Sequence, residues 1–247
     1  MAKAERTPNQ WSWNEGKIQE ALEGFRSYLR SDEGKRHNDE HERRKKRAQD
    51  FLKDEATIDG LTSEQLAELL RDIDAYYGDR RKEAVRRIGQ GNTGYIKEVK
   101  DWLKRLIAYD GQSPLPTTEY LSTGYASELL TMRFPEEFYL VNNASIEGMR
   151  CLGQGSLPDR SPAAYPEWQP LFRDLLERIN EVVQQELQRP ANFHDVDLFL
   201  WWVVREWRPA REQEVATPSN QSTSLLVRYF EEKVFQFTTE QVAAFYA

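Results

Sequence analysis

Apolar residues recur at intervals of three and four through most of this chain, which places them on one face of an α-helix. Five inward stripes are clear: Ile18, Ala21, Leu22, Phe25 and Leu29; Leu66, Leu69, Leu70 and Ile73; Ile96, Val99, Leu103 and Leu106; Leu171, Leu175, Ile179, Val182 and Leu187; and Val196, Phe199, Leu200, Val203 and Trp207. Alternation typical of β-strands is limited to "EFYLV" (137–141) and "VFQF" (234–237). The pattern therefore predicts an all-α fold, a multi-helix globular array with little or no β-strand.

Capping signals and helix breakers divide the chain into parts. Thr62 and Gln65 form a capping-box pattern, and Asn92 is placed to cap the helix that follows it. The Pro- and Gly-rich segment "GQSPLPTTE" (111–119) is the best internal boundary. We expect helices at about 119–132 and 167–188 beyond it. The predicted organisation is a charged helical subdomain at 1–110, an aromatic-rich helical subdomain at 111–212, and a linker with a final helix at 213–247.

The final helix begins with a capping-box pattern at Thr238 and Gln241 and reaches Ala247 after about two turns. A helix this short is marginal on its own. The pattern favours a polypeptide that continues into a further domain over a natural frayed terminus.

Composition predicts a globular, cytoplasmic protein without a membrane segment. The 247 residues are 39% hydrophobic, which suffices for a sizeable core. The single Cys151 excludes an internal disulfide and suits a reducing compartment. The longest apolar run, "VDLFLWWVV" (196–204), falls far short of the ~20 residues that a membrane helix needs.

Charge is distributed unevenly along the chain. The net charge of −7 combines 23 Lys/Arg and 22 Asp/Glu in residues 1–110 with 11 Lys/Arg and 19 Asp/Glu in residues 111–247. A surface for a polyanion such as DNA is therefore expected in the first part.

The first candidate DNA contact is the segment "RRKEAVRRIGQGNTGYIK" (80–97), where cations precede a Gly-rich turn and a helix N-terminus. Free main-chain N–H groups at a helix N-terminus favour an anion, and Lys/Arg side chains contact phosphate. The same turn also suits an ordinary helix connection, and the sequence does not decide between the two. The candidate residues are Arg80, Arg81, Lys82, Arg86, Arg87, Gly89, Gly91, Asn92 and Lys97.

A weaker candidate is the run "RRKKR" (43–47), which lies on an expected helix rich in carboxylates. Its cations are Arg43, Arg44, Lys45, Lys46 and Arg47, and the neighbouring acids are Asp39, Glu40, Glu42 and Asp50. Local ion pairs on a solvated face are favoured over a phosphate site here.

No pattern points to a metal site or a catalytic centre. His37 and His41 lie one helical turn apart, but a solvated pair is favoured because no third ligand has a suitable spacing. His194 is expected near a helix start, and Cys151 as a small buried hydrophobe. Glu231 and Lys233 form half of a nuclease-type motif without the Asp that should precede it.

Longer stretches resemble a known family. "STGYASELLTMRFPEEFYLVNNASIEGMRCLG" (122–153), a Tyr-rich loop, a helix and "DVDLFLWWV" (195–203) resemble the helical N-terminal region of McrB-type AAA+ GTPases of modification-dependent restriction systems. "FTTEQVAAFYA" (237–247) resembles the helix that leads into their nucleotide-binding domain. The resemblance covers about residues 60–247 and consists of apolar and small residues rather than a catalytic signature.

The resemblance implies a region that recognises DNA, modified or unmodified, while the parent protein forms an oligomer and works with a nuclease subunit. This chain departs from the whole family protein because it has no Walker A Gly-Lys-Ser/Thr, and "GQGNTG" (89–94) lacks the phosphate-binding Lys. No nucleotide or other cofactor is expected here.

The same stretch is also similar to the layout of helix-hairpin-helix glycosylases. Asn142 and Asn143 stand where that layout has its catalytic Asp, so glycosylase chemistry does not carry over. We instead expect "FPEEFYLVNN" (134–143) to be an aromatic corner that orders the helices on either side.

Taken with these patterns, the resemblance implies a non-catalytic DNA-recognition or specificity region of an McrB-like restriction GTPase in anti-phage defence. The alternative is a protein–protein adaptor that organises the AAA+ assembly or docks a partner. A cryptic nuclease or glycosylase-like protein is the minor alternative.

Overall fold

The computed structural model describes residues 13–73, 79–118, 121–208 and 210, and the side chains of residues 79–81 fall outside this description. The chain forms two compact units, Met1–Trp207 and Arg208–Ala247. Almost all of the second unit lies outside the described residues. The expected linker, the helix at 238–247, "VFQF" and the Glu231/Lys233 pair all lie there.

All regular secondary structure among the described residues is helical, which confirms the all-α expectation. The α-helices are α1 (Glu15–Arg30), α2 (Asp32–Phe51), α3 (Glu55–Gly60), α4 (Ser63–Arg71), α5 (Asp79–Gly89), α6 (Thr93–Ile107), α7 (Thr123–Arg133), α8 (Asn143–Cys151), α9 (Gln169–Leu187) and α10 (Phe193–Trp202). A 3-10 helix, η1 (Pro162–Trp168), precedes α9, and a π-helical turn, η2 (Val203–Trp207), follows α10.

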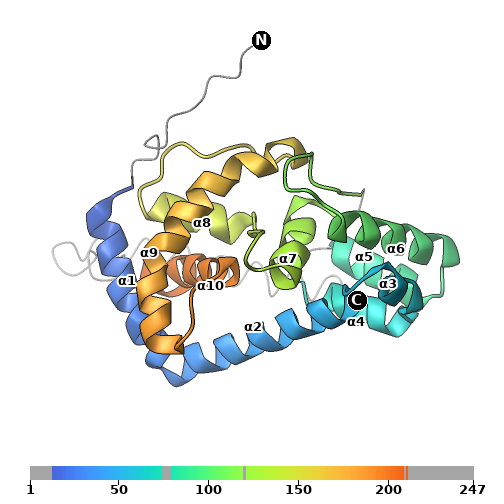
Figure 1. The fold of residues 1–247 in the computed structure, drawn as a ribbon, viewed down its shortest axis with the longest axis horizontal. Coiled ribbons are helices and arrows are strands. Elements are labelled where there is room, and N and C mark those ends of the chain that lie inside the picture. The colour runs from blue at the N-terminus through green and yellow to red at the C-terminus, as the bar shows by residue number, and fades with distance from the viewer. Residues whose placement is uncertain (1–12, 74–78, 119–120, 209, 211–247) are drawn as a thin grey trace, which may run out of the picture. The chain divides into compact units, whose positions relative to one another are not determined.

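Two helices form the centre of the first unit. In α7 every residue from Gly124 to Met132 is buried, and in α10 all residues except Asp197 and Trp201 are buried. Other helices pack on them: α2 and α6 contact α7, whereas α8 and α9 contact α10 (Figure 1). Further out, α4 and α5 pack on each other, and α3 and α5 pack on α6. The helices around this centre are amphipathic because each has one buried face and one face in water.

Several helix starts are set by the side chains that the sequence indicates. The Thr62/Gln65 capping box at α4 is present, and the Asn92 side chain caps α6. Asn192 forms a further capping box with Asp195 at the start of α10. His194 is a residue of the first turn of α10, as expected.

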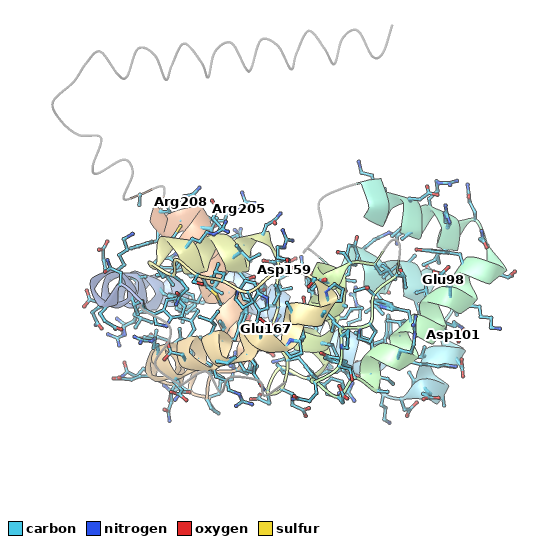
Figure 2. All side chains as sticks on the ribbon, turned by 90° about the horizontal axis from the view of Figure 1, so that it is seen from above. Glu98, Asp101, Asp159, Glu167, Arg205 and Arg208 are labelled. Carbon is cyan, nitrogen blue, oxygen red and sulfur yellow. The ribbon has the colours of Figure 1, made fainter. Side chains whose placement is uncertain are left out.

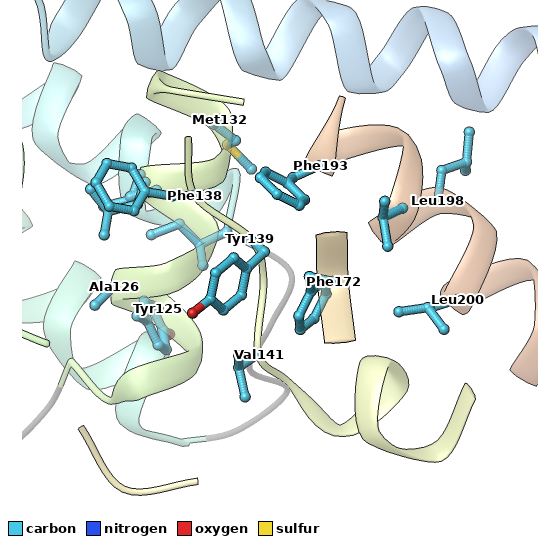
Figure 3. Close-up of a cluster of buried hydrophobic side chains, with 14 of the residues drawn as sticks. Tyr125, Ala126, Met132, Phe138, Tyr139, Val141, Phe172, Phe193, Leu198 and Leu200 are labelled. Carbon is cyan, nitrogen blue, oxygen red and sulfur yellow. The ribbon is translucent and has the colours of Figure 1, made fainter. Parts of the chain in front are cut away.

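The segment 134–143 is the aromatic corner that its composition predicts. Phe138, Tyr139, Leu140 and Val141 are all buried. The ring of Tyr139 stacks on Phe172 with 4.6 Å between centroids, and Phe193 approaches its edge at 5.7 Å (Figure 3). The backbone here forms no strand, although residues 137–141 have the alternation of one. Aromatic packing explains the apolar run instead.

Helices before and after the segment 111–119 contact one another. The helices α2 and α6 precede the segment, α7 follows it, and both α2 and α6 contact α7. The segment is itself attached to the helices around it. Trp102 Nε1 donates a hydrogen bond to the carbonyl of Pro116 at 3.0 Å, and the N–H of Leu115 donates to the carbonyl of Pro162 at 2.9 Å.

None of the helices in the described part of the chain combines the length and apolar character needed to cross a bilayer.

Candidate nucleic-acid interface

The predicted DNA-contacting segment forms a helical hairpin made of α5, a short turn and α6. The N–H of Gly91 donates to the carbonyl of Ile88 at 2.9 Å, and the N–H of Asn92 donates to the carbonyl of Arg87 at 3.2 Å. This pair of bonds is a Schellman motif, and it requires a left-handed residue just after the helix. Gly91 supplies it, with φ of 70°. The turn is therefore closed by the main chain.

Packing sets which face of α5 reaches solvent. Ala84 and Ile88 are buried, and α5 contacts α4 and α6. Lys82 and Gln90 are exposed, as is most of the Arg86 side chain at 55%. Among the described cations of this helix, Lys82 and Arg86 therefore lie on its outward surface.

Glu83 holds two of these cations. Arg86 donates from Nε to Glu83 Oε2 and from Nη2 to Oε1, both at 2.7 Å, and Arg87 Nε donates to Oε1 at 2.7 Å. These hydrogen bonds lower the pKa of Glu83 to about 2, so it is ionised at neutral pH. The described charges of α5 still have a positive excess, because Lys82, Arg86 and Arg87 outnumber this one carboxylate.

Both arginines are held by a second neighbour as well. Arg86 Nη1 donates to Gln90 Oε1 at 2.8 Å. The guanidinium of Arg87 lies 5.5 Å from the ring centroid of Tyr95 on α6, a cation–π distance. The arginine pair is thus oriented on the hairpin before any ligand arrives.

The turn exposes main chain next to this pair. Gly89, Gly91 and Asn92 are exposed, and no atom lies within 4 Å of the position of a Cβ added at Gly89 or Gly91. Asn92 Oδ1 accepts from the N–H of Tyr95 at 3.0 Å, which occupies one N–H group of the α6 N-terminus.

The hairpin brings together most of the first candidate set. Lys97 is exposed on the second turn of α6, and Figure 2 shows Glu98 and Asp101 further along that helix. The backbones of Arg80 and Arg81 belong to the first turn of α5, while their side chains lie outside the described residues.

The weaker candidate cluster lies apart from the hairpin, on α2. Arg44 contacts Glu40 at 2.9 Å, Arg43 lies 3.9 Å from the same carboxylate, and Lys45 donates to Glu42 at 2.6 Å. Ion pairs within the helix were expected here and are present. Arg47 instead contacts Asp72 at 2.7 Å and Glu68 at 2.9 Å, which links α2 to the α4 region. Lys46 is exposed.

The two histidines of α2 are not the solvated pair that their neighbours predict. Both are half-buried against α10: His37 contacts the edge of Trp201 with 4.9 Å between centroids, and His41 lies 4.6 Å from the buried His194. Among the described residues, no group of three or more His, Cys, Asp or Glu side chains has the arrangement of a metal site.

The residues of the glycosylase-like stretch have structural partners. Asn142 caps α8 through a capping box with Ser145, and Asn143 Oδ1 accepts from Arg160 at 2.6 Å. Cys151 is half-buried, so the expectation of a buried residue is only approximate.

Glu83 and Gln90 are the residues of this surface that were not among the predicted candidates. A detectable signal exists, because Glu83 precedes Arg86 and Arg87 by three and four residues, the spacings at which helix side chains meet. The contact of Arg87 with Tyr95 across the turn has no comparable signal.

No protein-family model, curated protein or solved structure matches this chain.

Proposed function

We propose that this chain is a non-catalytic DNA-recognition region of an McrB-like restriction GTPase that acts in anti-phage defence. The observation that supports this most directly is the α5–α6 hairpin, whose two helices expose Lys82, Arg86 and Lys97 and are joined by an exposed glycine turn. The resemblance of residues 122–153 and 195–203 to that family supplies the biological setting.

The proposed contact is with the phosphate backbone of a duplex. Arginine presents a planar fork of N–H donors that suits two phosphate oxygens, and lysine adds a point charge. Such contacts position a protein on DNA without reading its sequence. Recognition of a modified base, cleavage by a nuclease subunit and oligomer formation are assigned to the parent protein.

The test is a salt titration of duplex binding, with methylated and unmethylated DNA of the same sequence. Replacing Arg80, Arg81, Arg86 and Arg87 together by Gln should weaken binding roughly tenfold or more at low salt. The salt slope should fall by about one counterion for each phosphate that the variant no longer neutralises.

The control is the same replacement at Arg43, Arg44, Lys45, Lys46 and Arg47, because the described structure engages Arg43, Arg44, Lys45 and Arg47 in ion pairs. This second variant should change binding less, at unchanged helicity. Equal effects of both sets, or no binding by the wild-type chain at low salt, would exclude the hairpin as the DNA contact.

A protein–protein adaptor is the second candidate, and the acidic character of residues 111–247 favours it. The exposed carboxylates of this part include Asp159 and Glu167, labelled in Figure 2, together with Glu177 and Glu181 on α9. This function would be favoured if the wild-type chain does not bind duplex DNA at low salt but does bind a basic protein partner. High salt should weaken the binding of that partner.

A further inference from the structure

The carboxylate of Glu83 accepts three hydrogen bonds from two neighbouring arginines. Two come from Arg86 and one from Arg87, all at 2.7 Å. The two bonds from Arg86 form a side-on fork, the geometry with which guanidinium groups bind both carboxylates and phosphates. Glu83 therefore fills, in the free chain, the position of an anion bound by two arginines.

We propose that Glu83 is an internal competitor for a backbone phosphate at the Arg86/Arg87 pair, and that it limits the affinity of the hairpin for DNA. This inference rests on the proposed function. When a duplex binds, a phosphate oxygen takes the place of the Glu83 carboxylate on these N–H groups, and the carboxylate turns toward water.

Exposure makes this exchange feasible. The side chains of Arg86, Arg87 and Glu83 are 55%, 33% and 30% exposed. Ion pairs at exposed positions are weak because water and salt screen them. A phosphate at the same position also releases counterions from the DNA, which is a gain that the carboxylate lacks.

The arginines remain oriented after the carboxylate leaves. Gln90 Oε1 continues to accept from Arg86 Nη1, and the ring of Tyr95 continues to support the guanidinium of Arg87. Because neither contact involves Glu83, the pair keeps its orientation for an incoming anion. Glu83 thus competes with phosphate for the two arginines, and it is not needed to orient them.

The experiment compares Glu83→Gln with Glu98→Gln in duplex binding at several salt concentrations. Each variant removes one negative charge from the hairpin, but Glu98 is an exposed residue of α6 that pairs with none of the described arginines (Figure 2). We expect Glu83→Gln to tighten binding roughly 3–10-fold and to steepen the salt slope, and Glu98→Gln to tighten it less than about twofold.

A double-mutant cycle tests whether the gain passes through the arginines. In an Arg86→Gln/Arg87→Gln background, Glu83→Gln should have no larger effect than Glu98→Gln. Far-UV circular dichroism of each variant checks that the helices are retained.

The outcomes separate this inference from the proposed function. If the arginine variants weaken binding but Glu83→Gln matches Glu98→Gln, or weakens binding, the competitor role is excluded and DNA binding stands. If Glu83→Gln tightens duplex binding equally in the wild-type and Arg86→Gln/Arg87→Gln backgrounds, the gain in affinity comes from general electrostatics. The competitor role is then also excluded. If no variant binds duplex DNA at low salt, both proposals fail.

Discussion

Tyr139 and Tyr165 exchange hydrogen bonds in both directions. Tyr139 Oη donates to the carbonyl of Tyr165 at 2.6 Å, and Tyr165 Oη donates to the carbonyl of Tyr139 at 2.7 Å. Their rings stack with 4.7 Å between centroids. Tyr165 Oη also accepts from the N–H of Tyr139 at 3.3 Å. The pair thus ties the aromatic corner to the turn that leads into α9, and it satisfies the N–H and carbonyl of Tyr139, which lie outside any helix.

The Tyr165→Phe variant should be less stable than Tyr139→Phe. Loss of the Tyr165 hydroxyl leaves both the N–H and the carbonyl of Tyr139 without this partner inside the core, whereas loss of the Tyr139 hydroxyl affects one carbonyl. We expect a loss of about 2–3 kcal/mol for the first variant and about 1 kcal/mol for the second in urea denaturation. Tyr109→Phe, which removes an exposed hydrogen bond to Ser113, is the control and should cost less than either. Equal losses for the two core variants would contradict this asymmetry.

The corner between α1 and α2 should not tolerate a side chain at Gly34. A Cβ placed there would lie 2.0 Å from the carbonyl oxygen of Tyr28, which is main chain and has little freedom to move. The same carbonyl accepts from the N–H of Ser31 at 2.9 Å and from its hydroxyl at 2.7 Å. We expect Gly34→Ala to reduce the free energy of unfolding by about 3 kcal/mol or more.

Gly60→Ala is the matched control for that variant, because no atom lies within 4 Å of the added Cβ. Alanine is the better helix former, so this control should leave stability unchanged or raise it by up to about 1 kcal/mol. Thermal denaturation of both variants measures the contrast. A Gly34→Ala variant as stable as the control would contradict the close approach of Gly34 to the carbonyl of Tyr28.

Acid should destabilise the first unit through His194. Burial, followed by the charge of Lys45, lowers the pKa of His194 from its ordinary 6.5 to about 3, whereas a hydrogen bond to the main chain of His41 opposes this shift. Arg189 and Arg44 also face this ring. The unfolded chain therefore binds a proton below pH 6.5 that the folded chain binds only near pH 3. This stability is complete above pH 6.5 and is lost as the pH falls toward 3.

We expect the free energy of unfolding to fall by up to about 1.4 kcal/mol per pH unit below pH 6 from this group. The His194→Gln variant should have lower stability at pH 7 but a shallower decline between pH 6.5 and 4.5. His37→Gln removes a histidine from the same α2–α10 contact and serves as the control. Parallel pH profiles of wild type and His194→Gln, measured by urea denaturation, would exclude this role for His194.

Limited proteolysis should first cut the polar sequence 211–224, which overlaps the expected linker and lies outside the described residues. A second, slower cut is expected in the loop 153–161, where Gly155, Ser156 and Asp159 are exposed. A protease of broad specificity with mass spectrometry of the fragments measures this order. Early cleavage within α9 or α10 would contradict the packing described above, because both helices contribute to the core.

Much of the fold could be predicted because its signals are local. The stripes of α1, α4, α6 and α9, the caps of α4 and α6, and the aromatic corner depend on residues close together in sequence. The sequence predicts the start of α9 near 167, close to Gln169, although it does not predict the preceding 3-10 turn with Pro166. The hairpin surface is likewise predicted from a local pattern of cations and glycines.

The inner face of α2 could not be predicted because its partners are distant in sequence. This helix is continuous for 20 residues although it has few apolar side chains before Phe51. Its half-buried histidines contact Trp201 and His194, more than 150 residues away in the chain. Periodicity detects apolar stripes, and it does not detect a face completed by ring contacts and ion pairs.

Because α7 and α10 are buried on nearly all sides, the residues that stabilise the fold are largely distinct from the residues that can contact a partner. No residue of either helix is fully exposed, so a partner that meets the described residues contacts mainly the outer helices and the loops. Substitutions on that outer layer can change what the protein binds while the interior stays as it is. Among chains of this fold, partner choice and thermodynamic stability are therefore free to diverge at different positions, and a common fold need not imply a common ligand.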